Sequence, residues 1–149
     1  MVTAEDIYVD PSALCRLYLH QSLSREFSQG RRKTKGALAI TLHGRAELCN
    51  AICLAGFRGE LSAHGVAEAL HDLAADIEMG RMHQVDLLWR AALSRAAELS
   101  RVHTPTLGTR AADVLHVASA LELKLKRFVT FDSRQQKLAE ATGLRVIQI

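Results

Sequence analysis

The sequence predicts an α/β fold in which helices pack on a mostly parallel sheet. Short apolar runs alternate four or five times with longer segments of helical period, and this order is typical of parallel strands joined by helical crossovers. A length of 149 residues and a hydrophobic fraction of 48% are sufficient for one compact core. We therefore predict a single domain over residues 1–149.

Charge, cysteines and hydropathy exclude several classes of protein. The net charge of +3 is only a weak bias toward polyanionic partners. Cys49 and Cys53 lie four residues apart in a helical stretch, where an unstrained bridge is not possible, and Cys15 leaves the count odd. No apolar run approaches the roughly 20 residues that span a bilayer, and Glu5 and Asp6 are unlike the start of a signal peptide. We predict a reduced, cytoplasmic protein without a membrane segment.

The first part of the chain begins with a short strand at residues 7–9. Pro11 suits the first turn of a helix, which the apolar spacing extends over residues 12–27. Residues 30–36 are basic, bounded by glycines and without apolar period, so they are predicted as a solvated loop.

The middle of the chain contains the second strand and a helix pair. The apolar run 37–40 predicts a buried strand, and Thr41 is a suitable N-cap for a helix over residues 42–57. A further helix is predicted over residues 62–78. A third short strand is expected at 85–88, followed by a helix over 89–99.

The last part of the chain has the most distinct strand. Thr109 is the predicted N-cap of a helix that extends to Leu125. The run 127–131 is the strand, and Asp132 begins a helix over residues 133–141 in which Gln135 completes a possible capping box. Residues 144–149 are again apolar and β-prone.

Four acidic residues occupy informative positions in this scheme. Asp10 and Asp132 each come directly after a strand, and ligands bind at the carboxyl ends of parallel strands where the strand order reverses. Glu47 and Asp113 lie beside the apolar stripes of their helices. If the first and fourth strands are neighbours, the four carboxylates converge at one edge of the sheet.

Such a group of carboxylates predicts a divalent cation, because unneutralised like charges in a cleft repel one another strongly. Oxygen ligands suit Mg²⁺ or Mn²⁺, and such ions catalyse phosphodiester cleavage. The same residues have simpler explanations. Asp10 and Asp132 are good helix N-caps, and Glu47 and Asp113 can be solvated helix residues.

Four segments of the sequence together resemble the PIN domain, and within it the VapC class of bacterial toxin ribonucleases. The resemblance covers nearly the whole chain, and the ordered set is more specific than any single piece. The segments are Tyr8-Val9-Asp10-Pro11-Ser12-Ala13-Leu14, the helix that carries Glu47, Arg110-Ala111-Ala112-Asp113-Val114-Leu115-His116-Val117-Ala118, and Val129-Thr130-Phe131-Asp132.

This resemblance implies a three-layer α/β/α sandwich with four or five mostly parallel strands, and Mg²⁺-dependent cleavage of RNA, with Mn²⁺ as a possible substitute. It implies neutralisation by a VapB-type antitoxin, and we expect a homodimer. The acidic metal site and catalytic residues would be Asp10, Glu47, Asp113 and Asp132. Ser12 and Thr130 match polar positions beside the acids, where they can orient the carboxylates or serve only in capping and strand-end hydrogen bonds.

Several basic residues can have either a structural or a functional role. His116 lies three residues after Asp113 and is expected to be packed and hydrogen-bonded, with a role as base or RNA contact as the alternative. Arg110 can hold Asp113 or a phosphate, or form a surface ion pair. The basic segment of residues 31–35 can steer RNA or simply be solvated.

The predicted function is therefore a Mg²⁺-dependent endoribonuclease toxin. The alternatives are a PIN-type nuclease in RNA maturation or on DNA, and a non-catalytic PIN-like module that binds RNA or a protein. The presence of all four acids disfavours the last alternative, because a module without this chemistry has no physical need to keep mutually repelling carboxylates.

Overall fold

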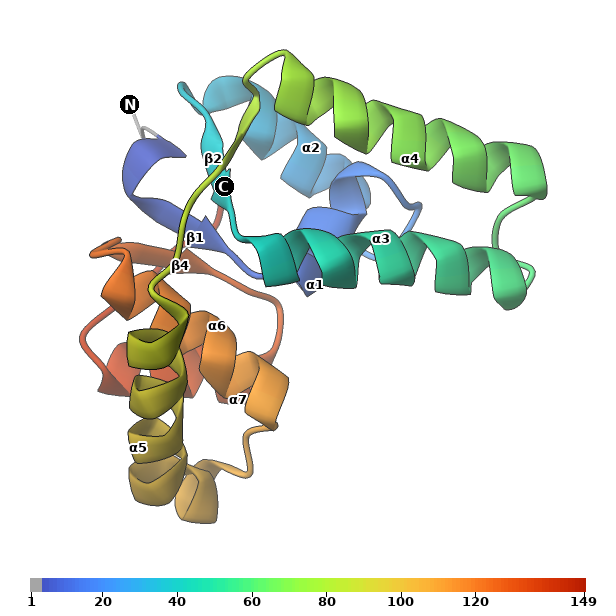
Figure 1. Cartoon of the computed structure of the whole chain (residues 1–149). Coiled ribbons are helices and arrows are strands. Elements are labelled where there is room, and N and C mark those ends of the chain that lie inside the picture. The colour runs from blue at the N-terminus through green and yellow to red at the C-terminus, as the bar shows by residue number, and fades with distance from the viewer. Residues whose placement is uncertain (1–3) are drawn as a thin grey trace.

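The computed structural model describes residues 4–149 and contains one five-stranded parallel sheet with the order β3-β2-β1-β4-β5 (Figure 1). The predicted α/β fold with a parallel sheet is thereby confirmed. The strands are β1 (Ile7–Val9), β2 (Leu38–Ile40), β3 (Met82–Gln84), β4 (Arg127–Val129) and β5 (Arg145–Val146).

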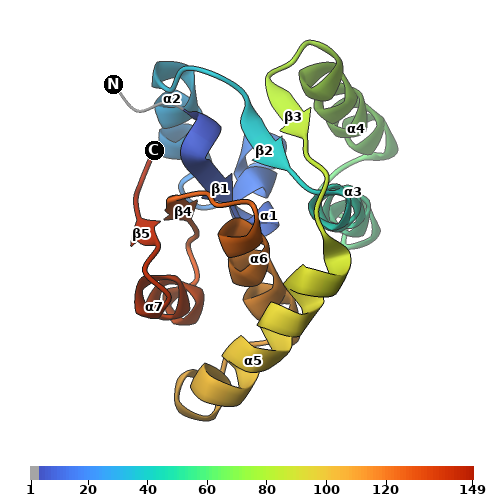
Figure 2. The same cartoon turned by 60° about the vertical axis from the view of Figure 1, so that its left-hand side comes forward.

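Helices cover both faces of the sheet, which gives the predicted three layers (Figure 2). One layer contains α1 to α4, and the other contains α6 and α7 with α5 against α6. No helix among residues 4–149 is both long and apolar enough to cross a membrane. The helices are α1 (Pro11–Leu14), α2 (Ser24–Lys33), α3 (Leu42–Phe57), α4 (Ala63–Glu78), α5 (Trp89–Leu107), α6 (Ala111–Glu122) and α7 (Ser133–Ala141).

The central strand β1 is buried on both faces. Ile7 and Val9 belong to the core beneath α1 to α4, while Tyr8 belongs to the core beneath α6 and α7. This alternation follows from the two-residue period of a strand. Tyr8 stacks on Phe128 of β4 with the ring planes only 2° apart, so the two central strands are joined by side chains as well as by backbone hydrogen bonds.

The strand order reverses between β1 and β4. The chain passes from β1 to β2 and β3 on one side, then returns to add β4 and β5 on the other side. Tyr8 pairs with Phe128, and Val9 pairs with Val129. Asp10 and Thr130, which follow these residues, therefore lie at the same carboxyl edge of the sheet. Ligands bind at this edge in such folds, at the point where the strand order reverses.

The predicted helices at residues 42–57 and 133–141 are found with those bounds, and their caps explain why. The Thr41 hydroxyl accepts a hydrogen bond from the Gly44 amide at 3.0 Å. The Asp132 carboxylate accepts one from the Gln135 amide at 2.8 Å. Each cap satisfies a backbone amide that the helix leaves free.

The predicted helix at residues 12–27 is wrong. A 3₁₀ turn at Cys15–Leu17 follows α1, and α2 begins only at Ser24. Leu23 has a φ of +65°, a conformation that interrupts a helix. The Arg16 guanidinium donates to the Ser22 carbonyl at 2.9 Å and thereby holds the intervening loop. Neither the positive φ nor this side-chain hydrogen bond to the backbone is visible in the apolar spacing, which therefore does not predict the break.

The predicted solvated loop at residues 30–36 is also wrong in part, because α2 continues to Lys33. Arg31 is only partly exposed and donates to the carbonyls of Thr34, Gly36 and Arg81. Its guanidinium thereby joins α2 to the segments that enter β2 and β3. A run of basic residues is not always a solvated surface, since one member here satisfies backbone acceptors.

The third strand lies at Met82–Gln84 rather than at residues 85–88. Met82 is buried and pairs with Leu38, whereas Leu88 is 77% exposed. The ladder ends where the Val85 amide donates to the Ile40 carbonyl. A short strand is placed by its hydrogen-bonding partner rather than by its own hydropathy.

The helix predicted over residues 89–99 continues to Leu107 and includes Pro105 in its last turn. Thr109 is not the N-cap of α6, because its hydroxyl is hydrogen-bonded to that of Thr104 at 2.9 Å. Arg110 occupies the cap position instead, without a side-chain cap bond. The turn between the two helices is made by Gly108, whose φ of +64° favours glycine.

Three aromatic rings join α3, α5 and α6. The His43 ring stacks on His116 with centroids 4.6 Å apart and meets Trp89 edge-on at 4.7 Å. Both ring nitrogens of His43 are buried without a hydrogen-bond partner among the described residues. Burial, together with the neighbouring His116, lowers the pKa of His43 from 6.5 to about 4.

This environment predicts a pH-dependent stability. The unfolded chain binds a proton at His43 near pH 6.5, whereas the folded chain does so only near pH 4, so the free energy of unfolding should decrease as pH falls between these values. His43→Phe should make that decrease shallower in urea denaturation series from pH 7 to 4. His64→Phe, at a side chain that is 91% exposed, is the control and should leave the slope unchanged. Equal slopes for the parent and His43→Phe would contradict the prediction.

Candidate active site

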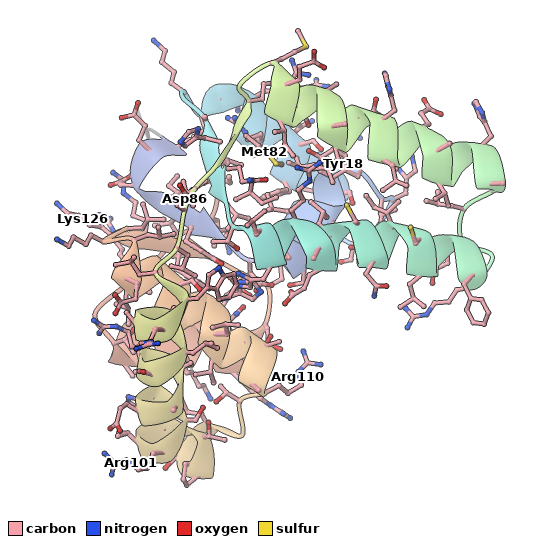
Figure 3. The ribbon with its side chains drawn as sticks, viewed as in Figure 1. Tyr18, Met82, Asp86, Arg101, Arg110 and Lys126 are labelled. Carbon is pink, nitrogen blue, oxygen red and sulfur yellow. The ribbon has the colours of Figure 1, made fainter. Side chains whose placement is uncertain are left out.

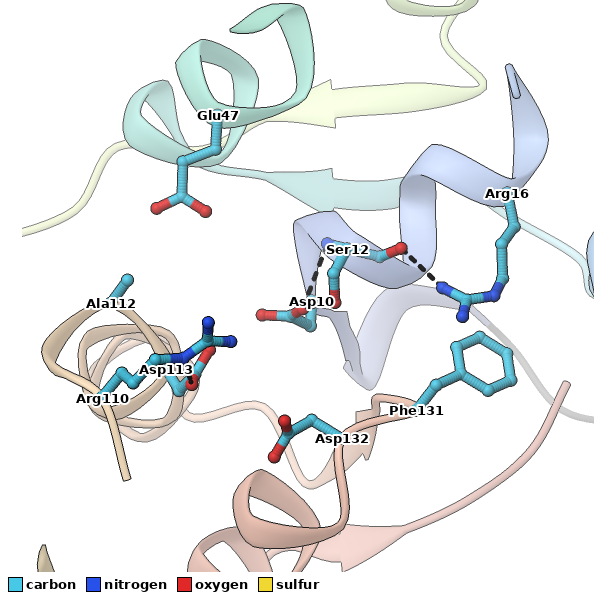
Figure 4. A pocket seen from close by; sticks show the side chains of 9 residues that line it. All are labelled: Asp10, Ser12, Arg16, Glu47, Arg110, Ala112, Asp113, Phe131 and Asp132. Carbon is cyan, nitrogen blue, oxygen red and sulfur yellow. Dashed lines mark hydrogen bonds and ion pairs between the residues drawn. The ribbon is translucent and has the colours of Figure 1, made fainter. Parts of the chain in front are cut away.

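An open cavity of about 480 Å³ lies at the carboxyl edge of the sheet, where the strand order reverses. The structure places the side chains of all four predicted acids around it (Figure 4). They come from four separate parts of the chain: the ends of β1 and β4, the middle of α3 and the first turn of α6. The lining residues are Asp10, Ser12, Arg16, Glu47, Arg110, Ala112, Asp113, Phe131 and Asp132.

Asp10 is the most buried of the four acids, at 3% exposure. Its Oδ2 accepts hydrogen bonds from the backbone amide of Ser12, at 3.1 Å, and from the Ser12 hydroxyl. Its Oδ1 accepts from the side-chain amide of Gln135 at 3.0 Å. Asp10 therefore caps α1 and lines the cavity at once, so the two interpretations of this residue are compatible.

Asp132 has a similar double position. Its Oδ1 caps α7 through the Gln135 amide, and its own amide donates to the Thr130 hydroxyl at 3.1 Å. Thr130 is 4% exposed and does not line the cavity. Its hydroxyl thus makes the strand-end hydrogen bond that was one of its two predicted roles, and in doing so it orients the segment that carries Asp132.

Asp113 is paired with Arg110, three residues earlier at the start of α6. The Arg110 Nε donates to Asp113 Oδ2 at 3.1 Å, and the two side chains are 77% and 16% exposed. Arg110 extends outward from the fold (Figure 3). Exposed ion pairs of this kind contribute roughly 0–1 kcal/mol, so the guanidinium can leave Asp113 at little cost.

Glu47 is connected to the core through His116. The His116 Nε2 lies 2.9 Å from Glu47 Oε2, and its Nδ1 lies 2.6 Å from the Tyr8 hydroxyl. Because a carboxylate only accepts hydrogen bonds, Nε2 donates to Glu47, and in the tautomer that carries its proton there Nδ1 accepts from the Tyr8 hydroxyl. Burial raises the pKa of Tyr8. The His116 side chain is 1% exposed. The expectation of a packed, hydrogen-bonded histidine is confirmed.

The pKa of Glu47 reflects opposing effects. Partial burial by itself raises it, but the hydrogen bond from His116 and the electrostatic influence of the two neighbouring imidazole rings together outweigh burial, so the pKa of Glu47 lies below its usual range. Glu47 is therefore held in its ionised form, as a cation ligand must be.

The sequence did not predict two side chains that line the cavity, Arg16 and Phe131, or the contacts that the Gln135 side chain makes beneath it. The Arg16 guanidinium lies 3.9 Å from the centroid of the Phe131 ring, and both line the cavity. Nothing in the local sequence indicates this pair, because it depends on the turn after α1. Gln135 was predicted as part of a capping box. Its backbone amide does bind Asp132, but its side chain turns toward Asp10 and Asp113 instead of back to Asp132.

The donor set fits a hard divalent cation in kind, since the four acids offer carboxylate oxygens. Among residues 4–149, no group of three or more His, Cys, Asp or Glu side chains is arranged to hold a metal ion. Mg²⁺ needs no such cage, because it commonly takes one or two carboxylates and keeps waters in its other positions. Direct ligation by all four acids stays a prediction.

The basic segment at residues 31–35 lies elsewhere. Its members are absent from the lining of the acidic cavity as the described chain forms it. The positive charges that do line the cavity are Arg16 and Arg110. A phosphate group that enters the cavity would therefore meet these two arginines, which suit phosphate through their planar guanidinium groups.

Comparisons with known proteins agree with this architecture. The crystal structure of FitAcB from Neisseria gonorrhoeae is similar, with a TM-score of 0.60 and 18% identity over 95% of this chain and 96% of that chain. At this identity the likeness shows the fold alone. No curated protein matches. The PIN domain model matches residues 7–141, a range that includes all four acids, so the chain belongs to the PIN domain family, whose members are typically metal-dependent nucleases.

Proposed function

We propose that this chain is a Mg²⁺-dependent endoribonuclease toxin of the VapBC type, built as a single PIN domain over residues 1–149. One observation carries the proposal: acidic side chains from four separate elements line one cavity at the carboxyl edge of the sheet. Capping explains the positions of Asp10 and Asp132, but no capping role brings Glu47 and Asp113 to the same cavity.

The residues around the cavity would have two roles, cation binding and phosphate binding. Asp10, Glu47, Asp113 and Asp132 would together form the acidic site that holds the cation. A bound Mg²⁺, or Mn²⁺ in its place, would supply the Lewis acid for in-line attack of water on the phosphodiester. Cleavage of this kind leaves a 5′-phosphate and a 3′-hydroxyl. Arg16 and Arg110, the positive charges that line the cavity, would bind phosphates of the substrate backbone.

The charge distribution supports a polyanionic substrate. The four acids contribute −4 to a net charge of +3, so the rest of the chain carries about +7. An acidic cavity in a more basic body attracts the nucleic-acid backbone to a site that holds a cation.

The toxin assignment and its partners rest on the sequence resemblance to the VapC class. From it we propose an RNA substrate, a VapB-type antitoxin and a homodimer. A PIN nuclease in RNA maturation would share the cavity, and a non-catalytic module would not need it. A gene for a small DNA-binding protein beside this one, whose product co-purifies with the chain and inhibits cleavage, is the expected sign of a toxin. Unimpaired cleavage in the presence of that product would favour RNA maturation.

The first prediction concerns Asp10. The purified chain should cleave total RNA with Mg²⁺ and stop with a chelator. Asp10→Asn should lower the rate at least about a hundredfold, because it removes a buried charge from the cavity. Asp86→Asn, at an exposed acid outside the cavity (Figure 3), is the matched control and should cleave like the parent. Equal rates for Asp10→Asn and the parent would exclude the proposed site.

A second prediction concerns His116. His116→Leu leaves Glu47 without its donor and the buried Tyr8 hydroxyl without its acceptor. It should raise the Mg²⁺ concentration for half-maximal cleavage about 10- to 100-fold. It should also lower the free energy of unfolding by about 1–3 kcal/mol. His71→Leu, at an exposed position on α4, provides the control. An unchanged Mg²⁺ requirement in His116→Leu would show that Glu47 does not depend on this hydrogen bond.

A further inference from the structure

One buried glutamine, Gln135, is hydrogen-bonded to three of the four acidic residues through its side chain and its backbone amide. Gln135, with 0% exposure, donates from Nε2 to Asp10 Oδ1 at 3.0 Å and to the backbone carbonyl of Asp113 at 3.2 Å. Its backbone amide donates to Asp132 Oδ1 at 2.8 Å. The end of β1, the first turn of α6 and the cap of α7 are thus joined through a single residue.

We propose that Gln135 is a positioning residue of the acidic site, one that fixes Asp10 and Asp113 relative to each other for cation binding. This inference rests on the proposed nuclease function. Gln135 is not among the residues of the described chain that line the cavity. It would therefore act only through the groups that it contacts.

The hydrogen bonds determine how the amide is oriented. Both acceptors of Gln135, a carboxylate and a carbonyl, need an N–H donor, and the side-chain nitrogen supplies two. The opposite orientation would place Oε1 against two oxygen atoms, so it is excluded by repulsion. The orientation that remains leaves Oε1 buried without a partner among the described residues. An unpaired buried carbonyl is unfavourable, so the two hydrogen bonds that Nε2 donates must offset the cost of burying Oε1.

The contacts also set what Asp10 can offer. A carboxylate has about four acceptor positions. Ser12 occupies two of them at Oδ2, and Gln135 occupies one at Oδ1. The remaining position lies on Oδ1, beside the bond from Gln135. The direction in which Asp10 presents a free lone pair is therefore fixed by the amide.

A neutral donor is the right chemistry at this position. A lysine or arginine would neutralise Asp10 and compete with the cation, whereas a glutamate would add a fifth negative charge and offer no donor. An asparagine is one methylene too short to span the same acceptors. Glutamine orients the carboxylate and leaves its charge available to a metal ion.

The test compares two adjacent glutamines on α7. Gln135→Met keeps the size of the side chain and removes both donors. Gln136→Met is the matched control, because Gln136 is also partly buried and its amide donates to the Thr130 carbonyl at 3.0 Å rather than to Asp10 or Asp113. Mn²⁺ binding is measured by electron paramagnetic resonance, and RNA cleavage is measured as a function of Mg²⁺ and of RNA concentration.

We expect Gln135→Met to weaken Mn²⁺ binding at least tenfold and to lower kcat 10- to 100-fold, with the KM for RNA unchanged. Gln136→Met should bind Mn²⁺ and cleave like the parent. Gln135→Asn, which keeps the amide but shortens its reach, should share the defect of Gln135→Met. Folding of each variant is checked by circular dichroism.

The outcomes separate this inference from the proposed function. If the parent binds Mn²⁺ and cleaves RNA while Gln135→Met does the same, the role of Gln135 is overturned and the nuclease stands. Equal defects in the Gln135 and Gln136 variants, or failure of both Gln135 variants to fold, would show a merely structural role and overturn it too. If the parent neither binds Mn²⁺ nor cleaves RNA, the proposed function fails, and this inference fails with it.

Discussion

The parallel pairing of β1 with β4 is the constraint on which the site depends. It is the point where the strand order reverses, and the register of Val9 with Val129 brings the following residues of both strands to one edge of the sheet. The stacked rings of Tyr8 and Phe128 join the same two strands on the face of the sheet that α6 and α7 cover. A shift of one residue in this register would turn Tyr8 to the opposite face of the sheet and separate the acids that follow.

Negative charges gathered at this edge must be stabilised by hydrogen-bond donors, and each of the four acids has at least one. Asp10 is held by Ser12 and Gln135, Glu47 by His116, Asp113 by Arg110, and Asp132 by the first turn of α7. Most of these donors are neutral. They fix the direction of the carboxylates without cancelling their charge, so the cavity keeps its attraction for a cation.

The sequence predicts the elements whose position depends on nearby residues, such as helix caps and apolar runs. Thr41 and Asp132 cap the helices that follow them, so those helices were placed correctly. The apolar runs before them locate β2 and β4, although β4 ends at Val129 and not at residue 131 as predicted. Other errors lie where a distant partner decides. Residues 82–84 form a strand because β2 pairs with them, and α2 continues beyond the predicted helix end, where Arg31 donates to the distant Arg81 carbonyl. The candidate site shows the same difference between local and distant effects. The acids could be located from strand ends and helix stripes in the sequence. The hydrogen bond from the Gln135 side chain to Asp10 could not, because the two residues are 125 positions apart.

Arg110 differs from the other hydrogen-bond donors to the four acids, because it is a cation at the surface. Arg110 is exposed, and its bond to Asp113 is of the weak surface type. The bonds to Asp10 and Glu47 come instead from side chains that are buried and fixed. Of the bonds to the four acids, the one from Arg110 is therefore the one whose loss would cost the least, and a cation bound at Asp113 would compete with it. A displaced guanidinium would still lie beside the cavity, where its planar donors would suit a phosphate of the proposed substrate.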